Sequence, residues 1–225
     1  SLNIKNKANG LTTYFNSSLN GSLSCILVDN VTFSNEHWTL KDTASNFSET
    51  SCNETLTYIP DDIFENYLES QSLGNGVAND NYVDTSKIAA VVTLSLNHLY
   101  IQDLTGIESF TALKMLIANN NELTFVDVSK NLALTHLVLS DNKLSTIDVS
   151  KNLKLTTILL NNNRLSAINV SKNTALNILG IQNNQLKSIN LSNNSALIHL
   201  TVQNNDLINL NVKNGNNGAI TTFNS

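Results

Sequence analysis

Residues 134–152 read LTHLVLSDNKLSTIDVSKN, and this stretch recurs along the chain with a period of 21 residues. The repeating unit has the form LxxLxLxxNxLxxIxVSKNxx. A degenerate copy precedes the regular ones, with Leu99 in place of the recurring Asn. Because one such unit buries little apolar surface alone, the period predicts a solenoid in which stacked coils share a core. Its apolar columns are Leu113, Leu134, Leu155, Leu176 and Leu197; Leu123, Leu144, Leu165, Leu186 and Leu207; Val126, Ile147, Ile168, Ile189 and Leu210; and Val128, Val149, Val170, Leu191 and Val212.

The LxL alternation within each unit has period 2, which places alternate side chains on one face of a short strand. The unit resembles the leucine-rich repeat, whose pattern LxxLxLxxNxL is met at residues 113–123 and in the four coils that follow. This resemblance implies a right-handed solenoid of α/β type, mostly β, with 21-residue coils and a short parallel sheet on the concave face. The IxVSKN half of each coil is rich in Val and Ile and predicts extended or short 3₁₀ structure rather than long helices.

One column of amides lies where each coil turns inward. Buried backbone groups need hydrogen-bond partners, and an Asn side chain offers both donors and an acceptor. We therefore predict that this column is a structural asparagine ladder rather than a set of ligand-binding residues. Its members are Asn121, Asn142, Asn163, Asn184 and Asn205.

The composition excludes several classes of partner. The chain has 225 residues, a net charge of −5 and only 14% charged residues, against about 25% in an ordinary soluble domain. Phosphate binding needs clustered Lys and Arg, so no nucleic-acid partner is predicted. No apolar run approaches the ~18 residues of a membrane span, so no membrane insertion is predicted.

The stretch TYIPDDIFENYLESQ at 57–71 departs from the repeat. Pro60 at a first-turn position, followed by two Asp residues, is a helix-start signal that suits the helix macrodipole. Ile63, Phe64, Tyr67 and Leu68 then fall on one helical face. We predict one N-capping helix that covers the first coil, followed by a loop from Gly74 to Asp84.

The first 53 residues resemble an ending rather than a beginning. LNIKN at 2–6 matches LNVKN at 210–214, and FNS at 15–17 matches FNS at 223–225, a constant offset of 208 residues. We therefore predict that residues 1–53 are the last coil and C-terminal cap of a preceding module. Residues 54–58 would be a linker. Residues 59–225 would be an N-cap helix followed by about six coils, with their own C-terminal cap missing.

The cap segment has two possible ways of meeting the coils. A linker of about four residues reaches at most ~14 Å, whereas six coils span about 25–30 Å, which disfavours capping of the last coil by residues 1–53 of the same chain. In trans, the last coil could accept this segment from another copy, and such contacts would build a filament end to end.

The only two cysteines, Cys25 and Cys52, bracket the cap segment. They are either reduced core thiols or a disulfide, and we favour a disulfide, which implies an oxidising, extracytoplasmic compartment. The motifs IPDDIFENYLE, DLTGIESFTAL at 103–113, VSKN and LSCILVDN resemble secreted or cell-surface leucine-rich-repeat proteins of Bacteroidetes such as flavobacteria. That resemblance implies export to the cell surface or the medium and supplies no substrate.

The sequence offers no assembled catalytic set, cofactor motif or metal site. His136 and His199 share a repeat position but stand three coils apart, about 14 Å along the sheet. Asp127 and Asp148 stand in adjacent coils and could bind calcium, although the same position is Asn in later coils, which favours a ladder of Asx turns. We therefore predict a protein that is not an enzyme and carries no cofactor.

The remaining candidate is the outward face of the concave sheet. An apolar stripe on an exposed sheet marks an interaction site, or it reflects the strand preference of branched residues. The leading hypothesis is an adhesion module that binds a protein or a glycan here; the alternative is a structural module of a tandem-repeat stalk or filament. The candidate binding residues are Met115, Ile117, His136, Val138, Thr157, Leu159, Ile178, His199 and Thr201.

Overall fold

The computed structural model describes residues 2–5, 14–19, 23, 25–41, 45–48, 56–216, 218 and 222–224. The chain divides into two compact units, Ser1–Thr55 and Leu56–Ser225. The predicted boundary lay between 53 and 59. Within the predicted linker, Leu56–Tyr58 form strand β4 and belong to the second unit.

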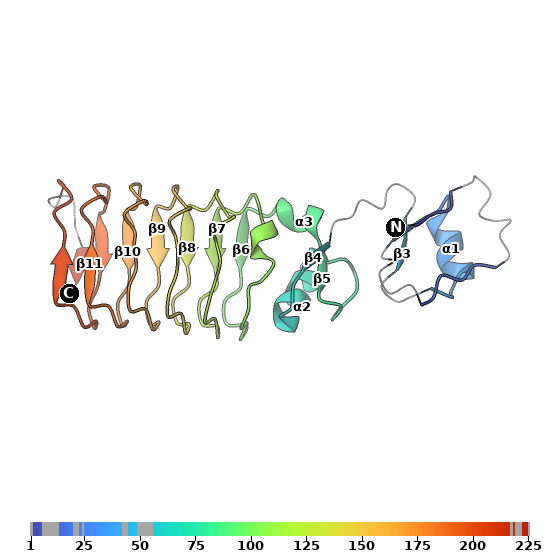
Figure 1. Ribbon diagram of the computed structural model, residues 1–225, viewed down its shortest axis with the longest axis horizontal. Coiled ribbons are helices and arrows are strands. Elements are labelled where there is room, and N and C mark those ends of the chain that lie inside the picture. Colours follow the sequence, from blue (N-terminus) through green and yellow to red (C-terminus); the bar gives the residue numbers. More distant parts are fainter. Residues whose placement is uncertain are drawn as a thin grey trace. The chain divides into compact units, whose positions relative to one another are not determined.

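The second unit is a solenoid built on one seven-stranded parallel sheet (Figure 1). Each strand of the regular coils pairs residue for residue with the equivalent strand of the preceding coil, so that Leu116 pairs with Leu137 and Leu137 with Ile158. The strands are β6 (Thr93–Ser95), β7 (Met115–Ile117), β8 (His136–Val138), β9 (Thr157–Leu159), β10 (Ile178–Gly180), β12 (His199–Thr201) and β14 (Thr222–Asn224).

The other half of each coil consists mainly of turns and of backbone without regular secondary structure. Among the described residues, only the last coils form a strand pair in this half. Strands β11 (Ser188–Asn190) and β13 (Asn209–Asn211) form a separate two-stranded parallel sheet.

The core of the solenoid is a single cluster of buried side chains, all aliphatic except Phe64 and Phe110. The middle residues of β6, β7, β8, β9, β10 and β12 point into it, and Leu116, Leu137 and Ile158 have no exposed surface. Each such side chain contributes roughly 1.5–3 kcal/mol through burial. Because every coil adds the same set, the core runs along the stack of coils.

A capping region precedes the first coil. It comprises β4, helix α2 (Asp62–Ser70), strand β5 (Tyr82–Asp84) and helix α3 (Thr85–Ala89). The first coil itself contains the 3₁₀ helix η2 (Ile107–Ser109). The Asp61 carboxylate caps α2 by accepting from the backbone N–H groups of Ile63 and Phe64, both at 3.0 Å. Its other oxygen accepts from the N–H groups of Gln102 at 2.7 Å and Asp103 at 3.1 Å. One side chain therefore starts the helix and ties it to the first coil.

The predicted helix differs from the observed α2 in its start and in its buried face. Pro60 lies before the capping residue rather than in the first turn, because Asp61 supplies the cap. Phe64 and Leu68 are buried, but Ile63 is 42% exposed. The prediction of one helix followed by a loop to Asp84 was also incomplete. The last residues of that loop form β5, which pairs antiparallel with β4, and a second helix, α3, follows β5.

Glu65 holds the turn between α2 and β5. Its carboxylate is fully buried and accepts from the backbone N–H groups of Asp80 and Asn81, each at 3.1 Å. Asn79 and Asn81 adopt the left-handed conformation, with φ of 58° and 64°. Burial raises the pKa of Glu65, while the two N–H groups act in the opposite direction.

The first unit contains a three-stranded parallel sheet in the order β1 (Leu2–Asn3), β2 (Cys25–Leu27) and β3 (Asn46–Ser48). The predicted coil strand near Ile26 is therefore present. The following tail also contains helix α1 (Val31–His37), which was not predicted; its cap is Asn30, whose side chain accepts from the Phe33 N–H at 2.8 Å.

An aromatic cluster fills the small core of the first unit. Trp38 is 2% exposed and stacks on Phe15 at a centroid distance of 5.0 Å, and Phe47 contacts Trp38 edge-on at 5.9 Å. Cys25 is buried in β2. Cys52 lies outside the described residues, so the Cys25–Cys52 disulfide stays a prediction.

Reduction of this disulfide is expected to destabilise the first unit by about 3–4 kcal/mol, because a closed loop of this length restrains the unfolded chain. Trp38 is the only tryptophan, so its fluorescence during urea unfolding reports on the first unit alone. Far-UV circular dichroism, which the cysteine-free second unit dominates, is the internal control and should change little. Coincident Trp38 transitions with and without reductant would contradict the disulfide.

Candidate binding face

The predicted binding residues occupy the outward positions of β7, β8, β9, β10 and β12. We call this surface the outer sheet face, made of two rows. The first row is Met115, His136, Thr157, Ile178 and His199; the second is Ile117, Val138, Leu159, Gly180 and Thr201. The residues between the rows point into the core, so the period-2 argument places both rows together on one face.

Exposure varies along the rows. His199 is exposed and most other members are half-buried. Thr157 is only 9% exposed, because the larger side chains of His136 and Ile178 pair beside it on both sides. Thr157 therefore contributes less accessible surface than its column predicts.

Gly180 makes a notch in the second row. A Cβ atom at this position would lie 2.9 Å from Leu159 Cδ2 and 2.9 Å from Asn161 Oδ1. The side chains of Leu159 and Asn161 therefore lean over the glycine. The apolar stripe is consequently strongest from Ile117 to Leu159 and ends at this notch.

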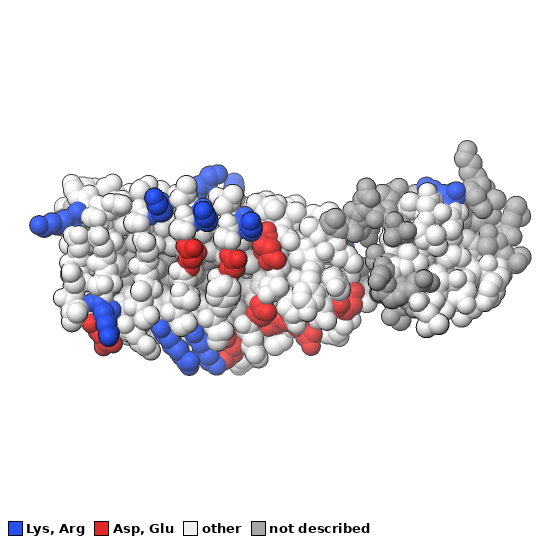
Figure 2. Space-filling view, viewed as in Figure 1, with Lys and Arg blue, Asp and Glu red and all other residues white. Residues whose placement is uncertain are grey.

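Neither row contains a Lys, Arg, Asp or Glu residue. Most acidic residues of the solenoid come from its first coils and from the cap around α2, and Figure 2 shows basic side chains along both rims of the coils in that view. The outer sheet face can therefore contact a partner through apolar area, imidazole rings and hydroxyl groups rather than ion pairs.

The predicted asparagine ladder bonds to the backbone between coils. In Asn142, Nδ2 donates to the carbonyls of Ala118 at 2.8 Å and Leu139 at 3.1 Å, and Oδ1 accepts from the Leu123 N–H at 3.1 Å. Asn163 and Asn184 repeat this arrangement. The donors and acceptors of these amides are therefore used by backbone groups of their own and the neighbouring coils.

A second buried ladder was missed. Asn131, Asn152, Asn173 and Asn194 have no exposed surface, and each Nδ2 donates to two carbonyls of the preceding coil, in Asn152 those of Val128 at 2.9 Å and Asn131 at 3.0 Å. The VSKN context of these asparagines is typical of a turn, so the pattern did not indicate that they are buried. The recurrence of this asparagine every 21 residues was the sequence signal that could have indicated a second ladder.

A third ladder lies on the surface beside the outer sheet face. Asp141, Asn162, Asn183 and Asn204 all adopt the left-handed conformation, with φ between 55° and 58°. Their side chains bond from coil to coil, with Nδ2 to Oδ1 distances of 2.7 Å, 2.5 Å and 2.6 Å. We call these four residues the rim ladder. It presents one carboxylate and three accessible amides, three positions after the second row of the outer sheet face.

Asp127 and Asp148 form Asx turns. Each Oδ1 accepts from a backbone N–H two residues on, that of Ser129 or Ser150, at 2.8 Å. The Ser150 hydrogen bonds hold the pKa of Asp148 below its ordinary value. Asn169 and Asn190 make the same turn. In the part of the chain that the structure describes, no group of three His, Cys, Asp or Glu side chains could hold a metal ion.

No family model matches the chain, and no curated protein matches it. Among the described residues, no helix is long and apolar enough to span a bilayer.

Solved structures with similar folds are leucine-rich-repeat proteins. The functional domain of InlJ from Listeria monocytogenes is 30% identical, with a TM-score of 0.63 over 70% of this chain and 36% of that one. The internalin InlF from the same organism is 23% identical, with a TM-score of 0.61 over 71% of this chain and 53% of that one. A Leptospira interrogans leucine-rich-repeat protein is 20% identical, with a TM-score of 0.55 over 61% and 38%.

These likenesses confirm the leucine-rich-repeat fold. The chain spans between 36% and 53% of the length of those three proteins. The InlJ domain includes a cysteine ladder, whereas the ladders described above are built from asparagine.

Proposed function

We propose that this leucine-rich-repeat chain is a non-enzymatic binding module that recognises a protein partner through the outer sheet face. The observation that carries the proposal is an uncharged apolar stripe at Ile117, Val138 and Leu159, on strands whose other face already fills the core. Contiguous apolar surface without a structural role is characteristic of interaction sites.

The arrangement around the stripe matches the anatomy of protein interfaces. Such interfaces have an apolar centre depleted in charge and a polar rim. Here the stripe is the centre, and the rim ladder supplies amides that donate and accept hydrogen bonds. A glycan could use the same amides, but an apolar stripe favours a protein.

The module would act outside the cytoplasm, as an adhesion domain at a bacterial surface. The predicted Cys25–Cys52 disulfide and the resemblance of the cap motifs to the Bacteroidetes type support this location. The extracytoplasmic location and the adhesion role are therefore part of this proposal.

Replacing Val138 and Leu159 with glutamate tests the binding face. The wild-type chain is screened against purified extracellular protein domains and an array of oligosaccharides by biolayer interferometry. For any bound protein, the Val138→Glu/Leu159→Glu variant should bind at least 100-fold more weakly, because it buries two unpaired charges at the centre of the interface.

The matched control is Leu132→Glu/Leu153→Glu. Leu132 and Leu153 are 57% and 58% exposed and lie outside the two rows, so this variant adds the same two negative charges without affecting binding. Thermal melts verify that all variants are folded. Unchanged binding by the double variant would overturn the proposal, and binding to oligosaccharides alone would replace a protein partner with a glycan.

A second candidate is a structural role in a tandem array. Residues 2–17 resemble residues 210–225. In the first unit, β1 pairs with β2 and Asn16 bridges to Leu40, whereas among the described residues the equivalent strands β13 and β14 have only β11 and β12 as partners. In this role, β2 and Leu40 of another copy would pair with β13 and β14, as they pair with β1 and Asn16 in the first unit.

Deleting residues 1–53 separates the two candidates. If stacking is the function, the full chain assembles in light scattering at high concentration and the deletion abolishes assembly. If binding is the function, the deletion leaves partner affinity unchanged. A strictly monomeric full chain would contradict the structural candidate.

A further inference from the structure

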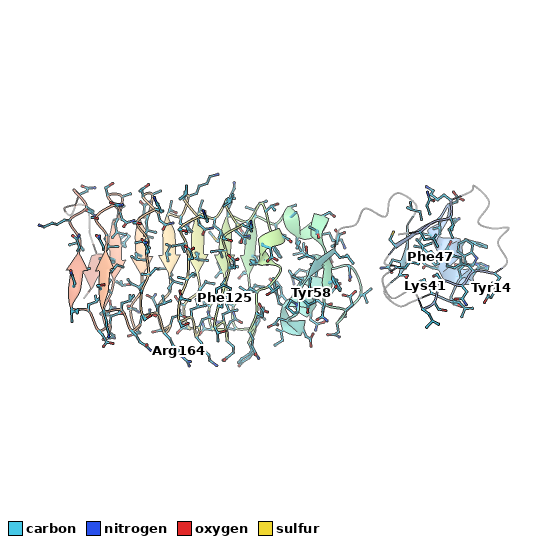
Figure 3. All side chains as sticks on the ribbon, viewed as in Figure 1. Tyr14, Lys41, Phe47, Tyr58, Phe125 and Arg164 are labelled. Atoms are coloured by element: carbon cyan, nitrogen blue, oxygen red, sulfur yellow. The ribbon has the colours of Figure 1, made fainter. Side chains whose placement is uncertain are left out.

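Phe125 is an exposed aromatic residue that the repeat does not require. In a solenoid of equivalent coils each position meets the same structural demands, and the positions equivalent to Phe125 hold Thr146, Ala167, Ser188 and Asn209. Four coils therefore fold with a small or polar side chain here. Phe125 nevertheless leaves 60% of its surface exposed (Figure 3).

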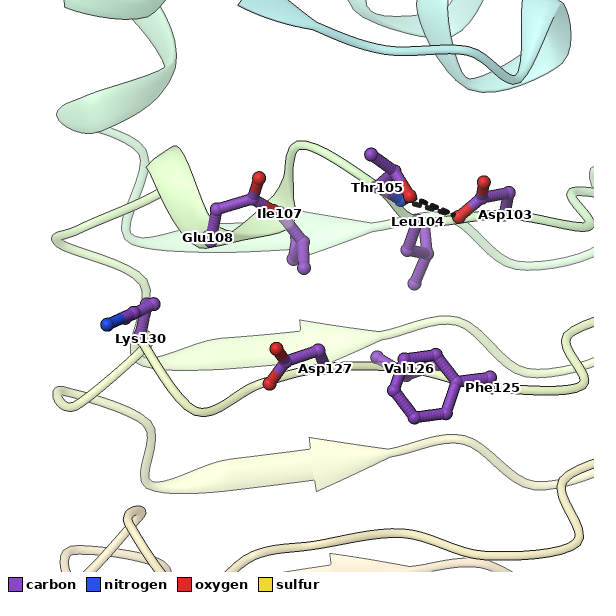
Figure 4. Close-up of a pocket in the computed structure, with 9 residues that line it drawn as sticks. All are labelled: Asp103, Leu104, Thr105, Ile107, Glu108, Phe125, Val126, Asp127 and Lys130. Carbon is purple, nitrogen blue, oxygen red and sulfur yellow. Dashed lines mark hydrogen bonds between the residues drawn. The ribbon is translucent and has the colours of Figure 1, made fainter.

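The ring of Phe125 borders a groove between the first two coils, away from the outer sheet face. The groove has a volume of about 320 Å³ and lies between residues 103–108 and residues 125–130 (Figure 4). Leu104, Ile107 and Val126 line it and are almost fully buried in the core beneath. We call this feature the aromatic groove.

Three carboxylates surround the aromatic groove, each held by a backbone N–H. Asp103 accepts from Thr105 N at 2.8 Å, Glu108 from Gly106 N at 2.9 Å and Asp127 from Ser129 N at 2.8 Å. Within the described residues no hydrogen bond uses the second oxygen of any of the three. Lys130 is the only basic residue of the lining, so the groove has an excess of negative charge.

We propose that the aromatic groove binds a lysine or arginine side chain of a protein partner. A cation over an aromatic face is attracted by the ring quadrupole, and the carboxylates can accept charge-assisted hydrogen bonds from it. The aliphatic stem of such a side chain packs against apolar lining residues. The aromatic groove shares no residue with the outer sheet face, so this proposal can be tested independently of the function proposed above.

The test uses substitutions that occur in other coils of the same chain. Phe125→Ala introduces the residue found at Ala167, and Asp127→Asn introduces the residue found at Asn169, whose side chain still accepts from the Ser171 N–H at 3.0 Å. Both variants should therefore fold. The probe is the blocked peptide Gly-Gly-Arg-Gly-Gly, compared with its Gln counterpart, in an NMR titration of the isotope-labelled full chain.

We expect the Arg peptide to shift resonances of residues 103–108 and 125–130, and the Gln peptide to shift none. Each variant should weaken binding about 3- to 10-fold, as expected for loss of a cation–π contact or one carboxylate. Asp148→Asn, the same change one coil further on, is the control and should leave affinity unchanged.

Equal binding of the Arg and Gln peptides, or wild-type affinity in Phe125→Ala, would overturn the proposal. Binding of the neutral oligosaccharide maltohexaose at the same resonances, unaffected by Asp127→Asn, would overturn it in favour of a sugar site.

Discussion

Replacing Asn163 with alanine is expected to lower the free energy of unfolding of the solenoid by about 3–5 kcal/mol. The Asn163 amide donates to the carbonyls of Leu139 at 3.0 Å and Leu160 at 3.1 Å, and its oxygen accepts from the Leu144 N–H at 3.0 Å. Alanine leaves the buried Leu144 N–H without a partner, which costs about 1–3 kcal/mol when water cannot replace the bond. It also removes one of two amide donors from each carbonyl, since Asn142 still donates to Leu139 and Asn184 to Leu160, and each lost bond adds about 0.5–1.5 kcal/mol. Urea unfolding followed by far-UV circular dichroism measures the loss.

Asn162, the adjacent residue, provides the control. It belongs to the exposed rim ladder and adopts a φ of 55°, which glycine accepts without strain. Asn162→Gly removes two surface hydrogen bonds, one donated to Asp141 and one accepted from Asn183, and should change stability by less than about 1 kcal/mol because water can replace both. Similar losses for the two variants would show that burial of the Asn163 amide is not what stabilises the coils.

Replacing Glu65 with alanine is expected to destabilise the capping region by about 2–4 kcal/mol. The N–H groups of Asp80 and Asn81 lose their shared acceptor, and the two left-handed residues Asn79 and Asn81 lose the contact that fixes their turn. Hydrogen exchange of α2 and β5, read by mass spectrometry, should accelerate first.

Glu69 supplies the matched control for Glu65. Its carboxylate also accepts from a backbone N–H of this loop, that of Gly76 at 3.2 Å, but it is only partly buried. Glu69→Ala should cost less than half as much, since water can replace the bond. A larger effect of Glu69→Ala would contradict the role assigned to Glu65.

The pH dependence of the Glu65 contribution has a definite sign. Its pKa is raised in the folded chain, so folding favours its protonated form. This contribution is fully present below the ordinary glutamate pKa and is lost as pH rises through the raised value. Relative to Glu65→Gln, the wild-type chain should therefore become less stable as pH increases from about 4. The opposite trend in paired urea titrations would contradict the assignment.

The coil architecture was predictable because its signal is redundant. Leu116, Leu137 and Ile158 pair in register, and the same apolar spacing appears in every unit. Side-chain burial beyond the apolar columns was harder to predict. Asn152 is fully buried, yet its VSKN context is that of a solvent-facing turn, and only the fold brings the carbonyls of the preceding coil to its amide.

The capping elements were predicted less well because nothing repeats there. Asp61 sets where α2 begins by accepting a hydrogen bond from the Ile63 N–H. It also accepts a hydrogen bond from the Gln102 N–H, which is 41 residues away in the sequence, so this contact could not be predicted from local sequence. Strand β5 lies in a stretch rich in Asn and Asp that resembles a loop, and it forms because β4 lies beside it.

Of the candidate sites, too, only the repeating part could be predicted from the sequence. The period-2 alternation of β7, β8, β9, β10 and β12 was enough to predict the residues of the outer sheet face. It did not predict that Thr157 is buried between His136 and Ile178. The aromatic groove needs residues from two coils, and η2 contributes Glu108 to it. Phe125 could have been noticed as the one aromatic residue in its column.

The residue-for-residue pairing of β6 to β10 also has a mechanical consequence. A force that pulls the two ends of the solenoid apart along the stack loads the inter-coil bonds in series, so that the weakest junction opens before its neighbours. The buried ladder bonds of Asn142 and Asn163 resist at each such junction in addition to the strand bonds. Under tension the solenoid would therefore lengthen in coil-sized steps and would absorb energy gradually instead of failing at once.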